Sequence, residues 1–142
     1  MVLAASRVVR ALDARDRLSR IAALFTFVSQ LVAGEAPAAE LRDGVDVLVR
    51  VAGPEAAPAL LLAALLKAAG ERASLDYARD LVFVKVEIGP ADAARLPPHA
   101  ALIVARRRAR LYLPLWVRHA RSPLGFLPQP TREGLAKRRF IA

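Results

Sequence analysis

The sequence contains no cysteine and only two histidines, His99 and His119. Without cysteine the chain can form no disulfide bond, no zinc site with cysteine ligands and no thiol nucleophile. Two histidines are too few for a histidine-rich metal site. We therefore expect neither a metal ion nor a cofactor.

Asparagine is also absent, methionine occurs once, and the basic residues are almost all arginine. This bias fits either a GC-rich genome or a hot-living host, because asparagine is thermolabile and hyperthermophilic proteins contain less of it. Both explanations stay open, and we favour a thermophile.

Long hydrophobic runs are missing too. The longest, residues 56–66, contains Pro58 and stops before Lys67, so it is shorter than the roughly 18 to 20 residues that cross a bilayer. Residues 1–17 carry charges every few positions and lack the apolar core of a secretion signal. We expect no membrane span and an intracellular, cytoplasmic location.

The chain has 142 residues, a length that suits one domain. Its charged residues are distributed unevenly along the sequence. Residues 1–94 contain 11 Lys/Arg and 12 Asp/Glu, whereas residues 95–142 contain 11 Lys/Arg and one acid, Glu133. A basic segment on a nearly neutral body indicates an acidic partner, either nucleic acid, a membrane surface or an acidic protein face.

Two helices are predicted in the first half. Apolar residues recur at steps of three and four from Leu18 to Val32, which predicts a helix that ends near Gly34 and for which Asp13 could be the cap. The run ALLLAALLKAAG, residues 59–70, predicts a central buried helix that ends at Gly70 and begins near Pro58. Between them, VDVLVRVAG (residues 45–53) fits either a short strand or a helical turn.

Four strands are predicted after Gly70: ASLDY (residues 73–77), LVFVKVEI (81–88), AALIVA (100–105) and RLYLPLW (110–116). No helix alternates with these strands, so neighbouring strands should pair as antiparallel hairpins in an α+β fold. We assign residues 1–117 to one α+β domain. Residues 118–142 contain three prolines that block a long helix or a central strand, and we expect an extended basic arm there.

The order of these elements resembles the transglutaminase-like superfamily, which has a papain-like core. The resemblance covers residues from about 13 to 128: LFTFVSQLV (residues 24–32) is similar to the family's first helix, and ALLLAALLKAAG is similar to the helix that the family's Gly-Asp-Cys motif opens. LVFVKVEI is similar to the strand that begins with the catalytic histidine, and LYLPLW (111–116) is similar to the stretch that precedes the catalytic aspartate. A Leu/Ala-rich core helix of no particular family is the alternative reading.

Matched to the family pattern, the three catalytic positions hold the wrong residues. Glu55 stands at the nucleophile position, Leu81 at the histidine position and Trp116 at the aspartate position. A second placement puts His99 at the histidine position, with better spacing to Trp116 and a poorer strand match. Leu and Trp cannot relay a proton, and a carboxylate at residue 55 cannot form a thioester.

Arginines provide the candidate binding residues. A cluster at a predicted hairpin tip and further arginines in the arm could bind phosphates or an acidic surface bidentately, although solvated charge is also common at such tips. The candidates are Arg106, Arg107, Arg108, Arg110, Arg118, Arg121, Arg138 and Arg139.

Three functions remain possible from the sequence. The resemblance implies a catalytically inactive transglutaminase-like domain that acts as a protein-binding or assembly module, for instance as a phage virion component that uses residues 118–142. The charge favours a nucleic-acid-binding protein that makes mainly phosphate contacts. The third is an enzyme that uses Glu55, Asp76, Asp80 or His99, for which no spacing singles out a pair.

Overall fold

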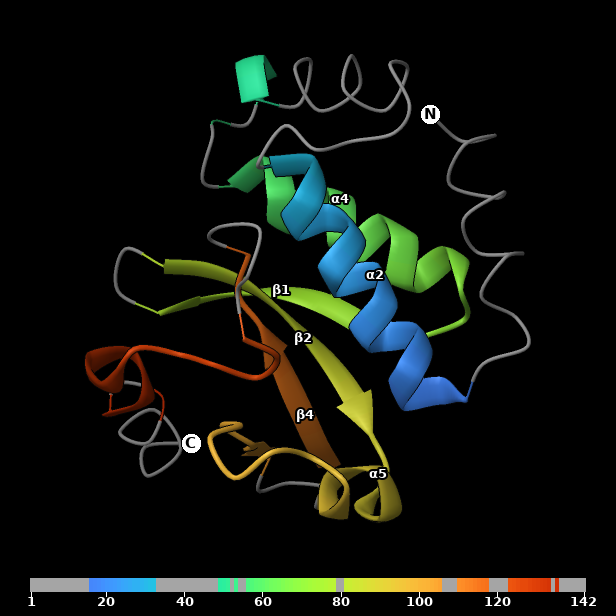
Figure 1. Ribbon diagram of the computed structural model, residues 1–142. Helices are drawn as coiled ribbons and strands as arrows, with labels where there is room; N and C mark the ends of the chain where they lie inside the picture. The colour runs from blue at the N-terminus through green and yellow to red at the C-terminus, as the bar shows by residue number, and fades with distance from the viewer. Residues whose placement is uncertain are drawn as a thin grey trace.

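A computed structural model describes residues 16–32, 49–51, 53, 56–78, 81–105, 110–117, 123–133 and 135. The described elements are α2 (Arg17–Val32), α4 (Ala56–Ala68), β1 (Ala73–Ala78), β2 (Leu81–Ile88), α5 (Pro90–Ala94), β3 (Ile103–Ala105) and β4 (Arg110–Leu115). Mixed helices and a four-stranded antiparallel sheet confirm the α+β prediction (Figure 1).

The strand order is β1-β2-β4-β3. The hairpins β1/β2 and β3/β4 confirm part of the pairing prediction, but β2 pairs with β4 and not with its neighbour in sequence, β3. The expectation that neighbouring strands always pair is therefore wrong at this point. Fourteen residues, 89–102, separate β2 from β3 and contain α5, so this connection is too long for a hairpin turn. It allows the short β3 to lie at the sheet edge.

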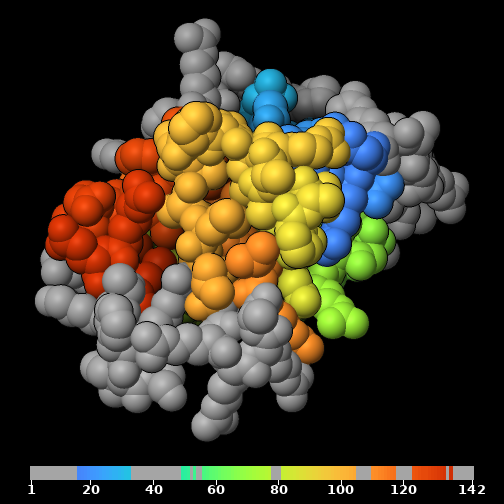
Figure 2. Space-filling model, turned by 90° about the horizontal axis from the view of Figure 1, so that it is seen from below, coloured from blue at the N-terminus to red at the C-terminus, as the bar shows by residue number. Residues whose placement is uncertain are grey.

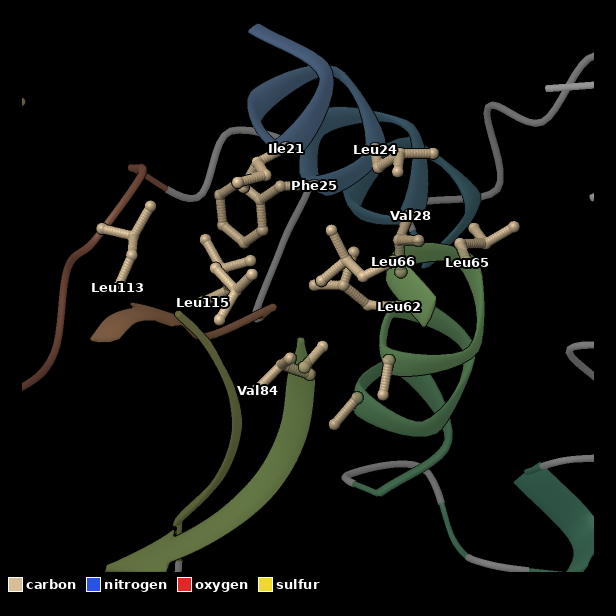
Figure 3. Packing of buried hydrophobic residues seen from close by; sticks show 14 of the residues in the cluster. Ile21, Leu24, Phe25, Val28, Leu62, Leu65, Leu66, Val84, Leu113 and Leu115 are labelled. Carbon is tan, nitrogen blue, oxygen red and sulfur yellow. The ribbon is translucent and has the colours of Figure 1, made fainter. Parts of the chain in front are cut away.

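Helices α2 and α4 cover one face of the sheet (Figure 1). Ile21 and Phe25 of α2 point toward Leu113 and Leu115 of β4, while Leu62 of α4 packs near Val84 of β2 (Figure 3). These side chains are at most 2% exposed. Since burying one such side chain stabilises a fold by about 1.5–3 kcal/mol, this cluster supplies most of the apolar driving force.

The helix boundaries follow from the local sequence. Asp16 caps α2: its Oδ1 accepts a hydrogen bond from the backbone N–H of Ser19 at 2.7 Å. Asp13, the cap suggested by the sequence, lies outside the described residues. α4 begins at Ala56 and not at Pro58. Proline has no backbone N–H, and in the first turn of a helix this is tolerated because the N–H groups there have no acceptor within the helix.

Gly70 ends α4 as expected, with φ +86 and its N–H bonded to the carbonyl of Lys67 at 3.0 Å. Residues 49–51 of the ambiguous VDVLVRVAG stretch are helical. Residues 45–48 and residue 52 lie outside the described part.

The segment after β4 contacts both faces of the sheet: Leu124 packs against the cluster formed with α2 and α4, whereas Leu127 and Leu135 lie on the opposite face. Leu127 and Leu135 are buried there in a second cluster with Phe83, Ala101 and Ile103. Residues 129–133 are helical, so this part of residues 118–142 is not extended throughout. Pro128 immediately precedes these helical residues and Pro130 is the second of them. Proline is tolerated at the start of a helix. Figure 2 shows residues 123–135, in red, beside the gold segment that leads into β3.

Candidate functional site

The strand positions matched to a catalytic histidine and aspartate, Leu81 and Trp116, lie at one end of the sheet. β2 begins at Leu81, and β4 ends at Leu115, which pairs with Val84. Leu81 and Trp116 both pack against the second cluster, on the face away from α4. The sheet therefore brings these two residues together and separates their side chains from α4.

The residues next to them face the other way. Val82 and Val117 pack against the cluster formed with α2 and α4. At this end of the sheet β2 and β4 thus present apolar side chains to both faces. A shift of the family match by one residue toward the C-terminus would place Val82 and Val117 at these positions, and neither is an acid or a base.

The remaining matched positions contribute little to a common site. Glu55 lies outside the described residues. His99 is exposed in the loop before β3, and its Nε2 lies 3.2 Å from the carbonyl oxygen of Leu124. His99 thus contacts the backbone of the segment that follows β4.

Of the eight candidate binding arginines, only Arg110 lies within the described part of the chain. It stands at the start of β4, with its Nε 3.8 Å from Oε1 of Glu87 on β2. The other seven, Arg106, Arg107, Arg108, Arg118, Arg121, Arg138 and Arg139, lie outside the described residues. Arg110 belongs to a cluster of charges at the other end of β2 from Leu81.

A hollow of about 490 Å³ that the sequence did not reveal lies beside this cluster and shares Glu87 with it. The hollow is formed where the first turns of α2, the α4–β1 connection and the end of β2 meet; Figure 2 looks onto this end of the molecule, with α2 in blue and β2 in yellow. Its lining residues are Arg17, Arg20, Ala69, Gly70, Glu71, Arg72, Glu87, Ile88 and Gly89.

Glu71 forms the buried base of this hollow. Only 4% of its side chain is exposed, and its Oε2 accepts a hydrogen bond from Nε of Arg17 at 2.7 Å. Arg20 approaches Oε1 at 4.0 Å. Arg17 also donates through Nη2 to the backbone carbonyl of Glu87. Arg17 therefore joins α2 to the α4–β1 connection and to β2.

Arg72 lies at the rim and is held much less tightly. Its side chain is 74% exposed, and its Nη1 lies 3.7 Å from Oε2 of Glu87. That distance is an ion pair and is too long for a hydrogen bond. Glu87 thus stands between two arginines, Arg72 and Arg110, on the sheet surface.

A further ion pair joins the start of α2 to the segment after α5. Arg95, just after α5, donates to Oδ2 of Asp16 at 3.0 Å. The hydrogen bonds from the backbone and hydroxyl of Ser19 and from Arg95 lower the pKa of Asp16 from 3.8 to about 2. Asp16 is therefore ionised at neutral pH, where it both caps α2 and holds the segment after α5.

The ionisable residues that line the hollow are three arginines and two glutamates. The described residues of the hollow include no serine, threonine, cysteine, lysine or histidine that could act as a nucleophile. Within the described part of the chain, no group of three or more His, Asp or Glu could hold a metal ion, and no helix is long and apolar enough to cross a membrane.

Sequence reasoning missed this site because its parts are far apart in the chain. Arg17 and Glu71 are separated by 54 positions. The one local signal was the spacing of Arg17 and Arg20, which are three residues apart and so share a helix face.

Comparison of the chain with family models, with curated proteins and with solved structures gives no match.

Proposed function

We propose that this chain is a catalytically inactive domain of transglutaminase-like arrangement that acts as a structural or assembly module. The observation that carries the proposal is the apolar end of the sheet. Leu81 and Trp116 on one face, and Val82 and Val117 on the other, leave β2 and β4 without a proton acceptor where the family keeps two catalytic residues. The order of α2, α4 and the antiparallel strands is consistent with this arrangement.

Assembly is proposed to use the segment that follows β4, in the cytoplasm or within a virion. Phe126 in this segment is 40% exposed, and its ring stacks on Trp116 with 6.1 Å between centroids. Val104 on the edge strand β3 is also 40% exposed. Apolar side chains that are exposed together can form a surface that binds another protein, and a second copy of the chain is the simplest partner.

Sedimentation velocity between about 1 and 100 µM tests this assembly, a range that spans ordinary reversible self-association. We expect concentration-dependent dimers and at least about tenfold weaker association for Phe126→Ser, because exposed aromatic anchors dominate such interfaces. Tyr77→Ser is the matched control, since Tyr77 is an exposed aromatic residue on the opposite edge strand. A strictly monomeric protein, or equal weakening by both substitutions, contradicts the assembly role.

A second candidate is a nucleic-acid-binding protein, favoured by the excess of basic residues in positions 95–142. Within the described part of this segment, Arg95 and Arg110 already pair with Asp16 and Glu87, while Arg132 is exposed. Phosphate contacts predict affinity for duplex DNA that falls steeply with salt and shows little base preference. Failure to bind both duplex and single-stranded DNA at low salt removes this candidate.

A further inference from the structure

The charged hollow between α2, the α4–β1 connection and the end of β2 has the volume of a ligand site and a mainly polar lining. Small-molecule sites commonly have volumes of about 300–1,000 Å³, and this one has about 490 Å³. A Cβ added at Gly70 or at Gly89, which both line it, would meet no atom within 4 Å. The glycines therefore leave open space beside the charged groups.

The charges around the hollow favour an anion. Three guanidinium groups line it, from Arg17, Arg20 and Arg72, against the two carboxylates of Glu71 and Glu87. Glu71 already accepts the hydrogen bond of Arg17 in the interior. At the rim the side chain of Arg72 is 74% exposed and that of Glu87 is 23% exposed, so the positive charge is the more accessible to a ligand.

The geometry at the rim leaves hydrogen-bond donors for a ligand. Both ion pairs of Glu87 are longer than hydrogen bonds, at 3.7 Å to Arg72 and 3.8 Å to Arg110. An oxyanion that enters the hollow could accept bidentate hydrogen bonds from Arg72, because a planar guanidinium fits two oxygens of a phosphate or carboxylate. Buried Glu71 would keep Arg17 fixed below it.

We propose that this hollow binds the oxyanion group of a small ligand, a phosphate or a carboxylate, with Arg72 as its principal contact. The inference goes beyond the assembly role and does not rest on it, since the hollow lies at the other end of β2 from Leu81. Arg72 supplies the recognition, and Glu87 competes with the ligand for the same guanidinium.

Titration with inorganic phosphate at constant ionic strength, followed by the backbone amide NMR signals of Gly70 and Gly89, tests the site. We expect saturable shifts at both glycines. Arg72→Gln should weaken phosphate binding about tenfold, as expected for the loss of charge-assisted hydrogen bonds. Arg132→Gln removes the same charge from an exposed position outside the hollow and should leave affinity within about twofold.

Glu87→Gln provides the opposite test. Removing this carboxylate should tighten phosphate binding several-fold, because Arg72 and Arg110 lose their competing partner. Glu133→Gln is the control, an exposed acid outside the hollow. Acetate titrated in the same way separates a carboxylate site from a phosphate site: the anion with the tighter saturable binding identifies the ligand group.

Three results would overturn the proposal. Shifts at the two glycines could fail to saturate with either anion. Arg72→Gln could bind phosphate as well as the wild-type chain. The two control substitutions could change affinity as much as their partners in the hollow, which would mean that net charge alone attracts the anion. If Glu87→Gln does not fold, Arg72→Gln and its control still decide the question, because Arg72 is mostly exposed.

Discussion

Replacing Gly125 with alanine should destabilise the protein strongly, because this glycine holds residues 123–127 against the loop before β3. Gly125 has φ +78, and its carbonyl accepts a hydrogen bond from the N–H of Ala101 at 2.9 Å. A Cβ at this position would lie 2.8 Å from Cβ of Ala100 and 3.1 Å from Cδ1 of Leu113. Both the backbone conformation and the lack of space therefore require glycine.

The size of the effect has two parts. An alanine in the left-handed region costs about 1–2 kcal/mol, and an overpacked contact with Ala100 costs about 1–3 kcal/mol more. Together Gly125→Ala should lower the free energy of unfolding by about 2–5 kcal/mol. For a domain of this size that corresponds to a melting temperature lower by about 6–15 °C.

Chemical denaturation of a double-mutant cycle separates the two parts. Ala100→Gly removes the closest clashing atom, so the double variant should recover the steric part and keep the backbone part. The closest contacts left would be 3.1 Å, to Cα of residue 100 and to Leu113. If Gly125→Ala lies within about 0.5 kcal/mol of wild type, or if the two substitutions are simply additive, residues 123–127 do not pack as described.

Three further predictions concern the ion pairs and the second cluster. Glu71→Ala should lower the free energy of unfolding by about 3 kcal/mol in urea denaturation, because it removes the buried partner of Arg17; the estimate is at the low end since Arg17 is 38% exposed. A loss below about 1 kcal/mol would contradict the buried pair. The lowered pKa of Asp16 implies stabilisation that is complete above about pH 4 and is lost as the pH falls toward about 2. The Asp16→Asn variant should therefore have a lower melting temperature than wild type at pH 7 and nearly the same melting temperature near pH 2. A difference in melting temperature that stays constant with pH would refute this role of Asp16. Leu127→Ala should cost about 2–4 kcal/mol in the same denaturation assay, since Leu127 is 2% exposed, and an effect as small as that of an exposed residue would show that residues 123–135 are not docked.

Helices α2 and α4 and the four strands could be predicted from the sequence because their signals are local, whereas α5 and the helical residues 129–133 were not predicted. The apolar steps from Leu18 to Val32 correspond to α2, and the four β-rich segments correspond to β1–β4. The order of strands could not be predicted, since the pairing of β2 with β4 depends on where the chain goes after α5. Sequence periodicity contains no information about such long-range contacts.

The candidate site was predictable only in part, for a related reason. The absence of cysteine and the apolar residues at positions 81 and 116 were visible at once. The direction of these two side chains could not be predicted. Leu81 and Trp116 face away from α4, and this depends on the strand register. The ion pair of Arg17 and Glu71 needs α2 to lie beside the α4–β1 connection, which only the packed structure provides.

The most direct test of a non-catalytic role is an acyl-transfer assay at high protein concentration. The chain, at about 100 µM, is incubated with a glutamine-containing peptide and hydroxylamine. The hydroxamate and the hydrolysed peptide are then measured by mass spectrometry. The rates are compared with that of the uncatalysed reaction, which active enzymes exceed by at least about 10⁶-fold. The account predicts product formation equal to that of buffer, with the intact mass of the protein unchanged. Turnover above buffer that disappears in Glu55→Gln or in His99→Ala would contradict it.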